Sequence, residues 1–262
     1  MTETPAAMRL LVIIPALNEE KSLRALLDEF KLAQPMLPWA TEAVVIDDGS
    51  TDRTAQVATA ANVRVVRLCR NLGIGAAVQT GLRLASREGF DAALQMDGDG
   101  QHPPGEIGRL LTRLSAADAP DLVVGSRHIV RRGYQATGAR RFGQLWLIFW
   151  LRLLCGLKLS DPTSGFRLYG AAALRLFEGA YPDDFPEPES LAIASKCGLL
   201  AVEEPVEMRA RQGGQSSING LKPIYYMIKV TLAVALAVAR HSGGRNVTKR
   251  NAALEPEEPN AG

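Results

Sequence analysis

Residues 94–104 read Leu-Gln-Met-Asp-Gly-Asp-Gly-Gln-His-Pro-Pro, and the rest of the chain is interpreted outward from them. They begin inside an apolar run, residues 91–96, that predicts a short buried strand. The strand ends at Asp97 and Asp99, whose carboxylates can face one divalent cation because residues i and i+2 of an extended segment point to the same side. Carboxylate oxygens suit Mg²⁺ or Mn²⁺, which often keep substrate phosphates among their ligands. The competing interpretation is an ordinary polar turn after a strand.

The residues after the two aspartates predict the end of the strand and the start of a helix. Pro103 and Pro104 end the extended segment, and a helix is expected to begin near Glu106. We interpret His102 as a loop residue rather than a metal ligand, because the oxygen ligands beside it do not call for an imidazole.

Strand and helix signals alternate four times through the first half of the chain. Apolar runs at 9–14, 43–46, 63–68 and 91–96 predict strands, and a helical pattern follows each of them. This alternation predicts an α/β fold with a mostly parallel sheet flanked by helices. Ligands of such sheets bind beyond the carboxyl ends of the strands. The polar residues expected at that edge are Asn18, Glu19, Asp47, Asp48, Asn71, Asp97 and Asp99.

Two loops at this edge have a choice of roles. Residues 71–75 read Asn-Leu-Gly-Ile-Gly and can hold phosphate at a helix N-terminus. They lack the spacing of a dinucleotide fingerprint and the lysine of a P-loop, so neither NAD nor ATP is expected there. Asp47 and Asp48 can accept hydrogen bonds from a nucleobase or ribose, or can cap the helix that follows.

The second half of the chain is less regular. Strands are expected at 121–125 and 202–208, and a helix is expected at 190–197. A basic segment, 131–141, precedes the very apolar segment 142–159, which fits either a core helix or a lipid-facing helix. Segment 221–240 predicts an interfacial or packed helix, because its cleanest apolar part is well short of the ~20 residues that a spanning helix needs. The polar tail from 241 onwards predicts disorder.

The composition excludes some classes of function. Hydrophobic residues make up 47% and charged residues 22%, as in ordinary globular proteins, and the net charge of +2 gives no reason to expect a nucleic-acid partner. Cys69, Cys155 and Cys197 lie far apart, without metal or redox spacing. They indicate reduced thiols, and with no signal-peptide pattern in residues 1–8 we expect a cytoplasmic protein.

Six motifs, taken in order, resemble those of one enzyme family. They are residues 14–19 (IPALNE), 46–52 (IDDGSTD), 71–73 (NLG), 97–103 (DGDGQHP), 125–127 (GSR) and 161–167 (DPTSGFR). On these motifs, over residues 9–217, the chain resembles family 2 glycosyltransferases of the GT-A fold, and within them the polyprenyl-phosphate sugar synthases of the dolichol-phosphate mannose synthase type. We therefore expect a Rossmann-like GT-A domain at 1–220, an apolar helix at 221–240 and a tail at 241–262.

The resemblance implies a role for each motif. Asp97, Asp99 and Gln101 would hold the metal ion. Arg127 and Arg211 would contact the phosphates of donor or acceptor and would count, with Asp99, as catalytic residues. The residues expected to bind substrate are Pro15, Leu17, Asn18, Glu19, Asp47, Asp48, Asn71, Gly73, Asp97, Arg140, Arg141, Arg167, Glu189 and Ser216.

The reaction that these residues imply is an inverting transfer at the anomeric carbon. A hexose, mannose or glucose, would move from a nucleoside diphosphate sugar to a polyprenyl phosphate, on an enzyme peripheral to the inner face of the cell membrane. Mg²⁺ or Mn²⁺ would neutralise charge on the departing diphosphate. The acceptor oxygen is already ionised near neutral pH, so arginines that position it through bidentate contacts would suffice without a strong base.

Two other functions stay open. A sugar or protein hydroxyl as acceptor would need a general base, for which Glu187, Glu189 and Asp161 are candidates. A nucleotide-sugar sensor or membrane scaffold without catalysis is the second, and the presence of both Asp97 and Asp99 argues against it. The sequence predicts no oligomeric state.

Overall fold

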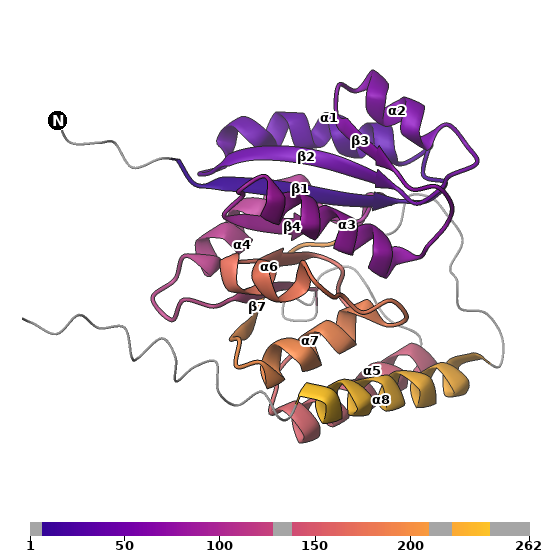
Figure 1. The fold of residues 1–262 in the computed structure, drawn as a ribbon, viewed down its shortest axis with the longest axis vertical. Helices are drawn as coiled ribbons and strands as arrows, with labels where there is room; N and C mark the ends of the chain where they lie inside the picture. Colours follow the sequence, from indigo (N-terminus) through magenta and orange to yellow (C-terminus); the bar gives the residue numbers. More distant parts are fainter. Residues whose placement is uncertain (1–6, 128–137, 210–221, 242–262) are drawn as a thin grey trace, which may run out of the picture.

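The computed structural model describes residues 7–127, 138–209 and 222–241, with side chains over 7–127, 142–209 and 227–241. Within this part of the chain, seven strands form one sheet in the order β3-β2-β1-β4-β6-β5-β7 (Figure 1). β6 lies antiparallel to both of its neighbours, and the other pairings are parallel. The strands are β1 (Arg9–Ala16), β2 (Ala40–Asp47), β3 (Arg64–Arg67), β4 (Ala92–Gln95), β5 (Leu122–Ser126), β6 (Arg167–Tyr169) and β7 (Ala201–Pro205).

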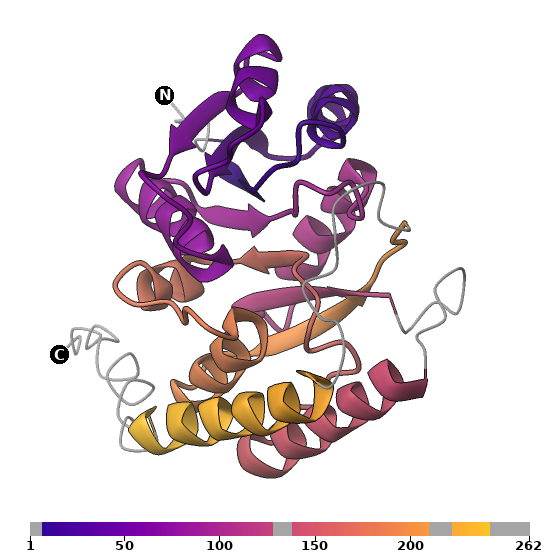
Figure 2. The same ribbon diagram turned by 90° about the vertical axis from the view of Figure 1, so that its right-hand side faces the viewer.

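Helices cover both faces of this sheet. α1, α2 and α4 pack on one face and α3, α6 and α7 on the other, while α5 and α8 lie side by side outside α7 (Figures 1 and 2). The helices are α1 (Leu23–Ala33), α2 (Thr54–Ala60), α3 (Ile74–Arg87), α4 (Ile107–Leu114), α5 (Gly138–Cys155), α6 (Ala171–Phe177), α7 (Pro186–Lys196) and α8 (Lys222–His241), with short 3₁₀ turns η1 (Gln34–Met36) and η2 (Pro104–Glu106).

β1 shows why the sheet lies between two layers of helices. Its residues are apolar on both sides, and all but the first are buried, as a parallel strand covered on both faces requires. Val12 packs in the cluster that includes α1, and Ile13 packs in the cluster that includes α3. A Cβ on Gly81 of α3 would lie 2.3 Å from Cγ2 of Ile13, so this glycine lets the helix approach the strand closely. The predicted mostly parallel sheet flanked by helices is confirmed.

The antiparallel strand β6 brings the second half of the chain to the same edge as the first. Gln95, at the end of β4, pairs with Arg167, which in turn pairs with Val124 near the end of β5. Because β6 runs the other way, the loop that precedes it meets the carboxyl ends of β1, β2, β4 and β5. Strand β6 was not predicted, since three residues after a polar turn are too short to show a period.

Two predicted elements have other bounds in the structure, and one helix was not predicted. α7 begins at Pro186 rather than residue 190, so Glu187 and Glu189 lie in the first turn of a helix instead of a loop. β7 ends at Pro205, before the expected residue 208. The short helix α6 also went unpredicted. The expected division into a domain at 1–220, a helix at 221–240 and a tail stays a prediction, because residues 1–6, 128–137, 210–221 and 242–262 lie outside the described chain.

The last described helix, α8, occupies the residues for which the sequence predicts a C-terminal helix. It packs on α5 and α7 through Val230, Val234 and Ala237, which cluster with Leu147 and Leu151 of α5. In the described ranges, none of the helices combines the length and the apolar character that a bilayer crossing demands.

Candidate functional site

A cleft of about 650 Å³ opens at the carboxyl ends of β1, β2 and β4. Its walls come from the loops after these strands and from the start of α3. Nine of the predicted site residues meet there, from four segments that are distant in sequence. The lining residues are Pro15, Ala16, Leu17, Asn18, Glu19, Asp48, Asn71, Gly73, Ile74, Ala77, Asp97, Gly98 and Asp99.

Asp48 fixes the glycine loop on one wall of the cleft. One carboxylate oxygen accepts a hydrogen bond from the backbone N–H of Leu72 at 2.7 Å, and the other accepts one from Gly73 at 2.9 Å. Gly73 has a φ of 95°, a conformation that favours glycine, and α3 begins at the next residue. Asp48 therefore fixes the loop that leads into α3, and the first residues of this helix line the cleft, where the helix dipole favours negative charge.

Asp47 does not line the cleft beside Asp48, although both were expected to bind substrate. As the last residue of β2 it points into the protein and is fully buried. Its Oδ1 accepts from the backbone N–H of Ser50 at 2.8 Å, and its Oδ2 lies 3.2 Å from Nε of Arg67. Asp47 therefore stabilises the turn after β2 from inside the protein instead of lining the cleft.

The loop after β1 is tied to the loop after β2. Asn18 adopts a φ of 56°, and its Oδ1 accepts from the backbone N–H of Thr51 at 2.9 Å. The Glu19 carboxylate accepts from Oγ of Ser22 at 2.6 Å and is nearly buried. Leu17, by contrast, is 38% exposed on the cleft wall, where it can contact a flat ligand group.

Asp97 and Asp99 lie together on the cleft wall, as their spacing predicts. Asp99 Oδ1 accepts from the backbone N–H of Gln101 at 3.0 Å. Within the described ranges, no three His, Cys, Asp or Glu side chains are placed to hold a metal ion. This arrangement fits Mg²⁺ or Mn²⁺ all the same, because such ions are commonly held by one or two carboxylates with substrate phosphates and waters. Gln101, the third expected ligand, does not line the cleft.

His102 supports this metal motif, a role that the sequence did not reveal. The side chain is buried, and its Nδ1 accepts from the backbone N–H of Asp97 at 3.1 Å. Its ring stacks on Phe166 at a centroid distance of 5.0 Å. That His102 is not a metal ligand stays a prediction. Phe166 lies 64 positions away, so no local pattern could show the stack.

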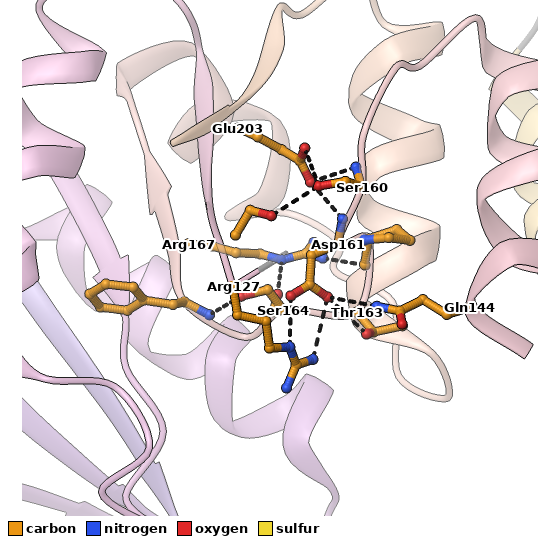
Figure 3. Close-up of polar contacts among 11 residues, drawn as sticks. Arg127, Gln144, Ser160, Asp161, Thr163, Ser164, Arg167 and Glu203 are labelled. Carbon is orange, nitrogen blue, oxygen red and sulfur yellow. Dashed lines mark hydrogen bonds and ion pairs between the residues drawn. The ribbon is translucent and has the colours of Figure 1, made fainter. Parts of the chain in front are cut away.

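The loop before β6 builds a second polar cluster around Asp161 (Figure 3). The fully buried Asp161 carboxylate accepts from Arg127 at 2.8 and 3.3 Å and from Gln144 of α5 at 3.4 Å. Glu203 of β7 accepts from the backbone N–H groups of Ser160 and Asp161 at 2.7 and 2.6 Å. Asp161 is engaged in orienting Arg127, which argues against the alternative that it is a general base.

Arg167 is a structural residue rather than the expected substrate contact. It is fully buried, and its guanidinium donates to the carbonyl oxygens of Pro162, Ser164 and Glu187 at 2.7–2.8 Å and to Oγ of Ser190. With these donors used, the side chain fixes the loop before β6 against α7. A Cβ on Gly165, in that loop, would lie 2.6 Å from Oδ2 of Asp97, so the loop abuts the metal motif directly.

The two glutamates on α7, Glu187 and Glu189, differ in the charges that act on them. Burial raises the pKa of Glu187, Arg167 opposes that shift, and the negative charge of Asp97 adds to it. Burial also raises the pKa of Glu189, but the charges around it are those of Asp183, Asp184 and Arg240. The charge of Asp97 acts on Glu187 but not on Glu189. The substrate role that was expected of Glu189 therefore fits Glu187 better.

The remaining predicted residues lie at the limits of the described chain. The backbone N–H of Arg209 donates to the carbonyl oxygen of Gln101 at 2.9 Å, which brings the chain to the metal loop two residues before Arg211. Arg211 and Ser216 lie outside the described residues, and Arg140 and Arg141 lie in α5 with their side chains outside them.

Comparison with known proteins gives consistent matches. The model of the family described as "Glycosyl transferase family 2" matches residues 11–176. An undecaprenyl-phosphate mannosyltransferase of Micrococcus luteus is 31% identical, over 81% of this chain and 88% of that protein. A polyprenol monophosphomannose synthase of Mycolicibacterium smegmatis is 29% identical, over 87% and 89%.

Among solved structures, a glucosyl-3-phosphoglycerate synthase from Mycobacterium tuberculosis superposes with a TM-score of 0.65. It covers 91% of this chain and 81% of that chain at 20% identity. That structure holds Mn²⁺, uridine diphosphate and glucosyl-3-phosphoglycerate. At this identity the likeness concerns the fold, which is GT-A.

Proposed function

Since the chain belongs to glycosyl transferase family 2, we propose that it moves a hexose from a nucleoside diphosphate sugar to a polyprenyl phosphate with inversion at the anomeric carbon. The observation that carries the proposal is the cleft in which Asp97 and Asp99 share the wall with the first residues of α3, behind a loop that Asp48 fixes. Two carboxylates for a metal ion and a helix dipole for an anion suit a diphosphate.

The donor would lie along this cleft. Pro15, Leu17 and Glu19 would contact the nucleoside, and Asn71 and Gly73 would lie near the diphosphate. Asp97 and Asp99 would hold Mg²⁺ or Mn²⁺, which when bound neutralises charge on the leaving diphosphate. His102 would hold the backbone of Asp97 by accepting a hydrogen bond from its N–H group, and Gly165 would leave room for the Asp97 carboxylate.

The acceptor phosphate would approach from the side of Arg127. Asp161 accepts two hydrogen bonds from Arg127, which orients the guanidinium, and the Arg127 side chain is 24% exposed. An ionised phosphate oxygen is a nucleophile without a base, and a fixed guanidinium would position it. Arg211 would join from the segment that begins beside Gln101. The relatives reported above are named for polyprenyl and undecaprenyl phosphate, which supports a lipid acceptor and a site of action at a membrane face.

Glu187 favours one alternative, transfer to a hydroxyl group. Its pKa is raised by burial and by the negative charge of Asp97, so it could accept the proton of an acceptor hydroxyl as that oxygen attacks the anomeric carbon. The same cleft and metal motif would serve this reaction.

One experiment separates these reactions. The protein is incubated with Mn²⁺ and a panel of nucleoside diphosphate sugars, once with a polyprenyl phosphate and once with hydroxyl acceptors such as phosphoglycerate, and products are identified by mass. A metal-dependent glycosylated lipid phosphate supports the proposal. Product only in the hydroxyl arm, lost in Glu187→Gln, would replace it with the alternative.

A further inference from the structure

The outer sides of α5 and α8 are apolar although they face away from the protein. Each helix buries one side, through Leu147 and Leu151 on α5 and Val230 and Val234 on α8. The opposite sides carry eight large apolar residues at helical spacing, and all of these except Trp146 are more than half exposed. The full set, which we call the outer face, is Phe142, Leu145, Trp146, Phe149, Leu153, Ile228, Leu232 and Leu236.

The two exposed sides form one continuous surface. α5 and α8 both pack on α7, so their free sides point the same way, and the two helices run side by side at the end of the molecule (Figures 1 and 2). Nε1 of Trp146 donates to Oγ1 of Thr231 at 3.0 Å, which joins the helices within the surface. Exposed apolar surface of this extent on a protein marks an interaction site.

The charges around the outer face select the partner. Over 138–155 and 222–241 the sequence contains no aspartate or glutamate. It does contain Arg140, Arg141, Arg152, Lys222, Lys229 and Arg240. Two helices that carry cations and no carboxylate, with an exposed apolar side that includes a tryptophan, match the surface of an anionic bilayer, although Asp183, Asp184 and Glu189 lie near Arg240 at the end of α8. They suit a second copy of the chain poorly, because a twofold contact would bring these cations together.

The outer face also adjoins the candidate acceptor site. Gln144, between Phe142 and Leu145 on α5, donates to the Asp161 carboxylate that orients Arg127. Within about one helical turn the surface therefore passes from a buried ion pair to exposed hydrocarbon side chains.

We propose that the outer face docks the protein on an anionic lipid bilayer, with α5 and α8 lying flat in the interface. The inference rests on the proposed function, because docking there would place Arg127 next to the headgroup of a lipid phosphate. It explains how a chain in which none of the described helices can cross a membrane reaches a lipid substrate.

The test compares two double variants that change net charge equally. Phe149→Asp with Leu232→Asp alters the outer face, and Leu32→Asp with Met36→Asp alters residues that are 77% and 86% exposed on α1 and η1. Binding is measured by cosedimentation with vesicles of phosphatidylcholine, with and without phosphatidylglycerol, in the absence of donor and acceptor. We expect the wild type and the α1/η1 variant to bind anionic vesicles equally. The outer-face variant should bind at least ~10-fold more weakly, because one buried Phe or Leu already contributes a factor of about ten.

Two further readouts keep the result unambiguous. Circular dichroism melting checks that both variants are folded, and light scattering gives the oligomeric state. Equal vesicle binding by the two variants would overturn the proposal. A wild type that is dimeric and binds no vesicles, with a monomeric outer-face variant, would overturn it as well.

Transfer to a short, water-soluble polyprenyl phosphate is also measured, without vesicles. If the wild type shows no such transfer, the proposed function is wrong but the docking proposal is unaffected. If the outer-face variant transfers the sugar as fast as the wild type but binds vesicles more weakly, the outer face acts in docking and not in catalysis.

Discussion

The two halves of the sheet position their polar residues at the carboxyl edge in different ways. In the first half, residues that line the cleft lie at the end of β1 and within two residues after β2 and β4, so each site residue closely follows its strand. In the second half, the residues around Asp161 precede an antiparallel strand and are held by Arg127, Arg167 and Glu203 from three other places in the chain. The first half is thus built from local segments, and the second half from contacts between distant ones.

This difference predicts which mutations act locally and which spread. A change at a first-half carboxylate should affect one ligand and leave the fold intact. A change in the second-half cluster should loosen several elements together, because each member satisfies buried partners.

The largest effect is expected for Asp99→Asn, which removes one of the two carboxylates of the metal motif. Loss of several kcal/mol of charge stabilisation in the transition state corresponds to a fall in transfer rate of about a thousandfold. The rate is measured over a range of Mn²⁺ concentrations, and thermal melting should be unchanged. Asp118→Asn, which changes an exposed pair with Arg113, is the matched control. Full activity of Asp99→Asn, or of protein treated with chelator, would rule out the metal site.

Asp161→Ala should show the spreading effect of the second half. Arg127 would lose its partner in a largely buried place, which costs about 3 kcal/mol, at the low end for broken buried pairs because Arg127 still reaches water. Denaturant unfolding measures this cost, and affinity for the nucleotide sugar should stay constant while the KM for acceptor rises. Asp28→Ala, which removes an exposed i,i+4 pair with Arg24, should leave both unchanged. A variant as stable as the wild type would show that the cluster is not a unit.

Gly165→Ala tests the point at which the two halves touch. The added methyl would lie 2.6 Å from Oδ2 of Asp97, so the carboxylate must rotate and the metal requirement should rise about tenfold, the equivalent of ~1.4 kcal/mol. Stability should change little, because the atom displaced is the end of a side chain. Gly179→Ala, where nothing lies within 4 Å of the new Cβ, is the control. Identical metal titrations of the two variants would show that the loop at Gly165 does not constrain the Asp97 carboxylate.

The smallest effect is expected at His102, which acts through one hydrogen bond. His102→Phe keeps a ring against Phe166 but leaves the Asp97 backbone N–H without its acceptor, a loss of about 1 kcal/mol that should raise the Mn²⁺ requirement roughly fivefold. His102→Asn restores an acceptor near Nδ1 and should recover most of the metal affinity. If His102→Phe leaves the Mn²⁺ requirement unchanged while His102→Asn raises it, the ring stack rather than the hydrogen bond supports the metal motif.

Most of the first half could be predicted from the sequence. The strand before Asp97, the spacing of Asp97 and Asp99 and the glycine loop are local patterns, and parallel strands align their ends without further information. Even there, the sequence could not separate Asp47 from Asp48, because neighbouring residues at a strand end point to opposite sides and only the register decides which one meets the cleft.

In the second half, prediction stopped where side chains depend on distant partners. Arg167 was expected to contact substrate because it is a cation in a motif, yet its guanidinium is buried among carbonyl oxygens of a loop and of α7. The sequence left segment 142–159 between a core helix and a lipid-facing helix, and α5 has one buried side and one exposed apolar side.

The sequence by itself determined the alternation of strands and helices, the metal motif and the family, since these reside in short-range periodicity and in motifs of consecutive residues. Only the tertiary structure decided that His102 supports Asp97, that Asp161 orients Arg127 and that α5 and α8 share an exposed apolar face. The physical reason is that hydrogen bonds, ion pairs and burial are properties of pairs of residues, and the members of these pairs come together only when an antiparallel strand and an outer helix layer fold across the sheet edge.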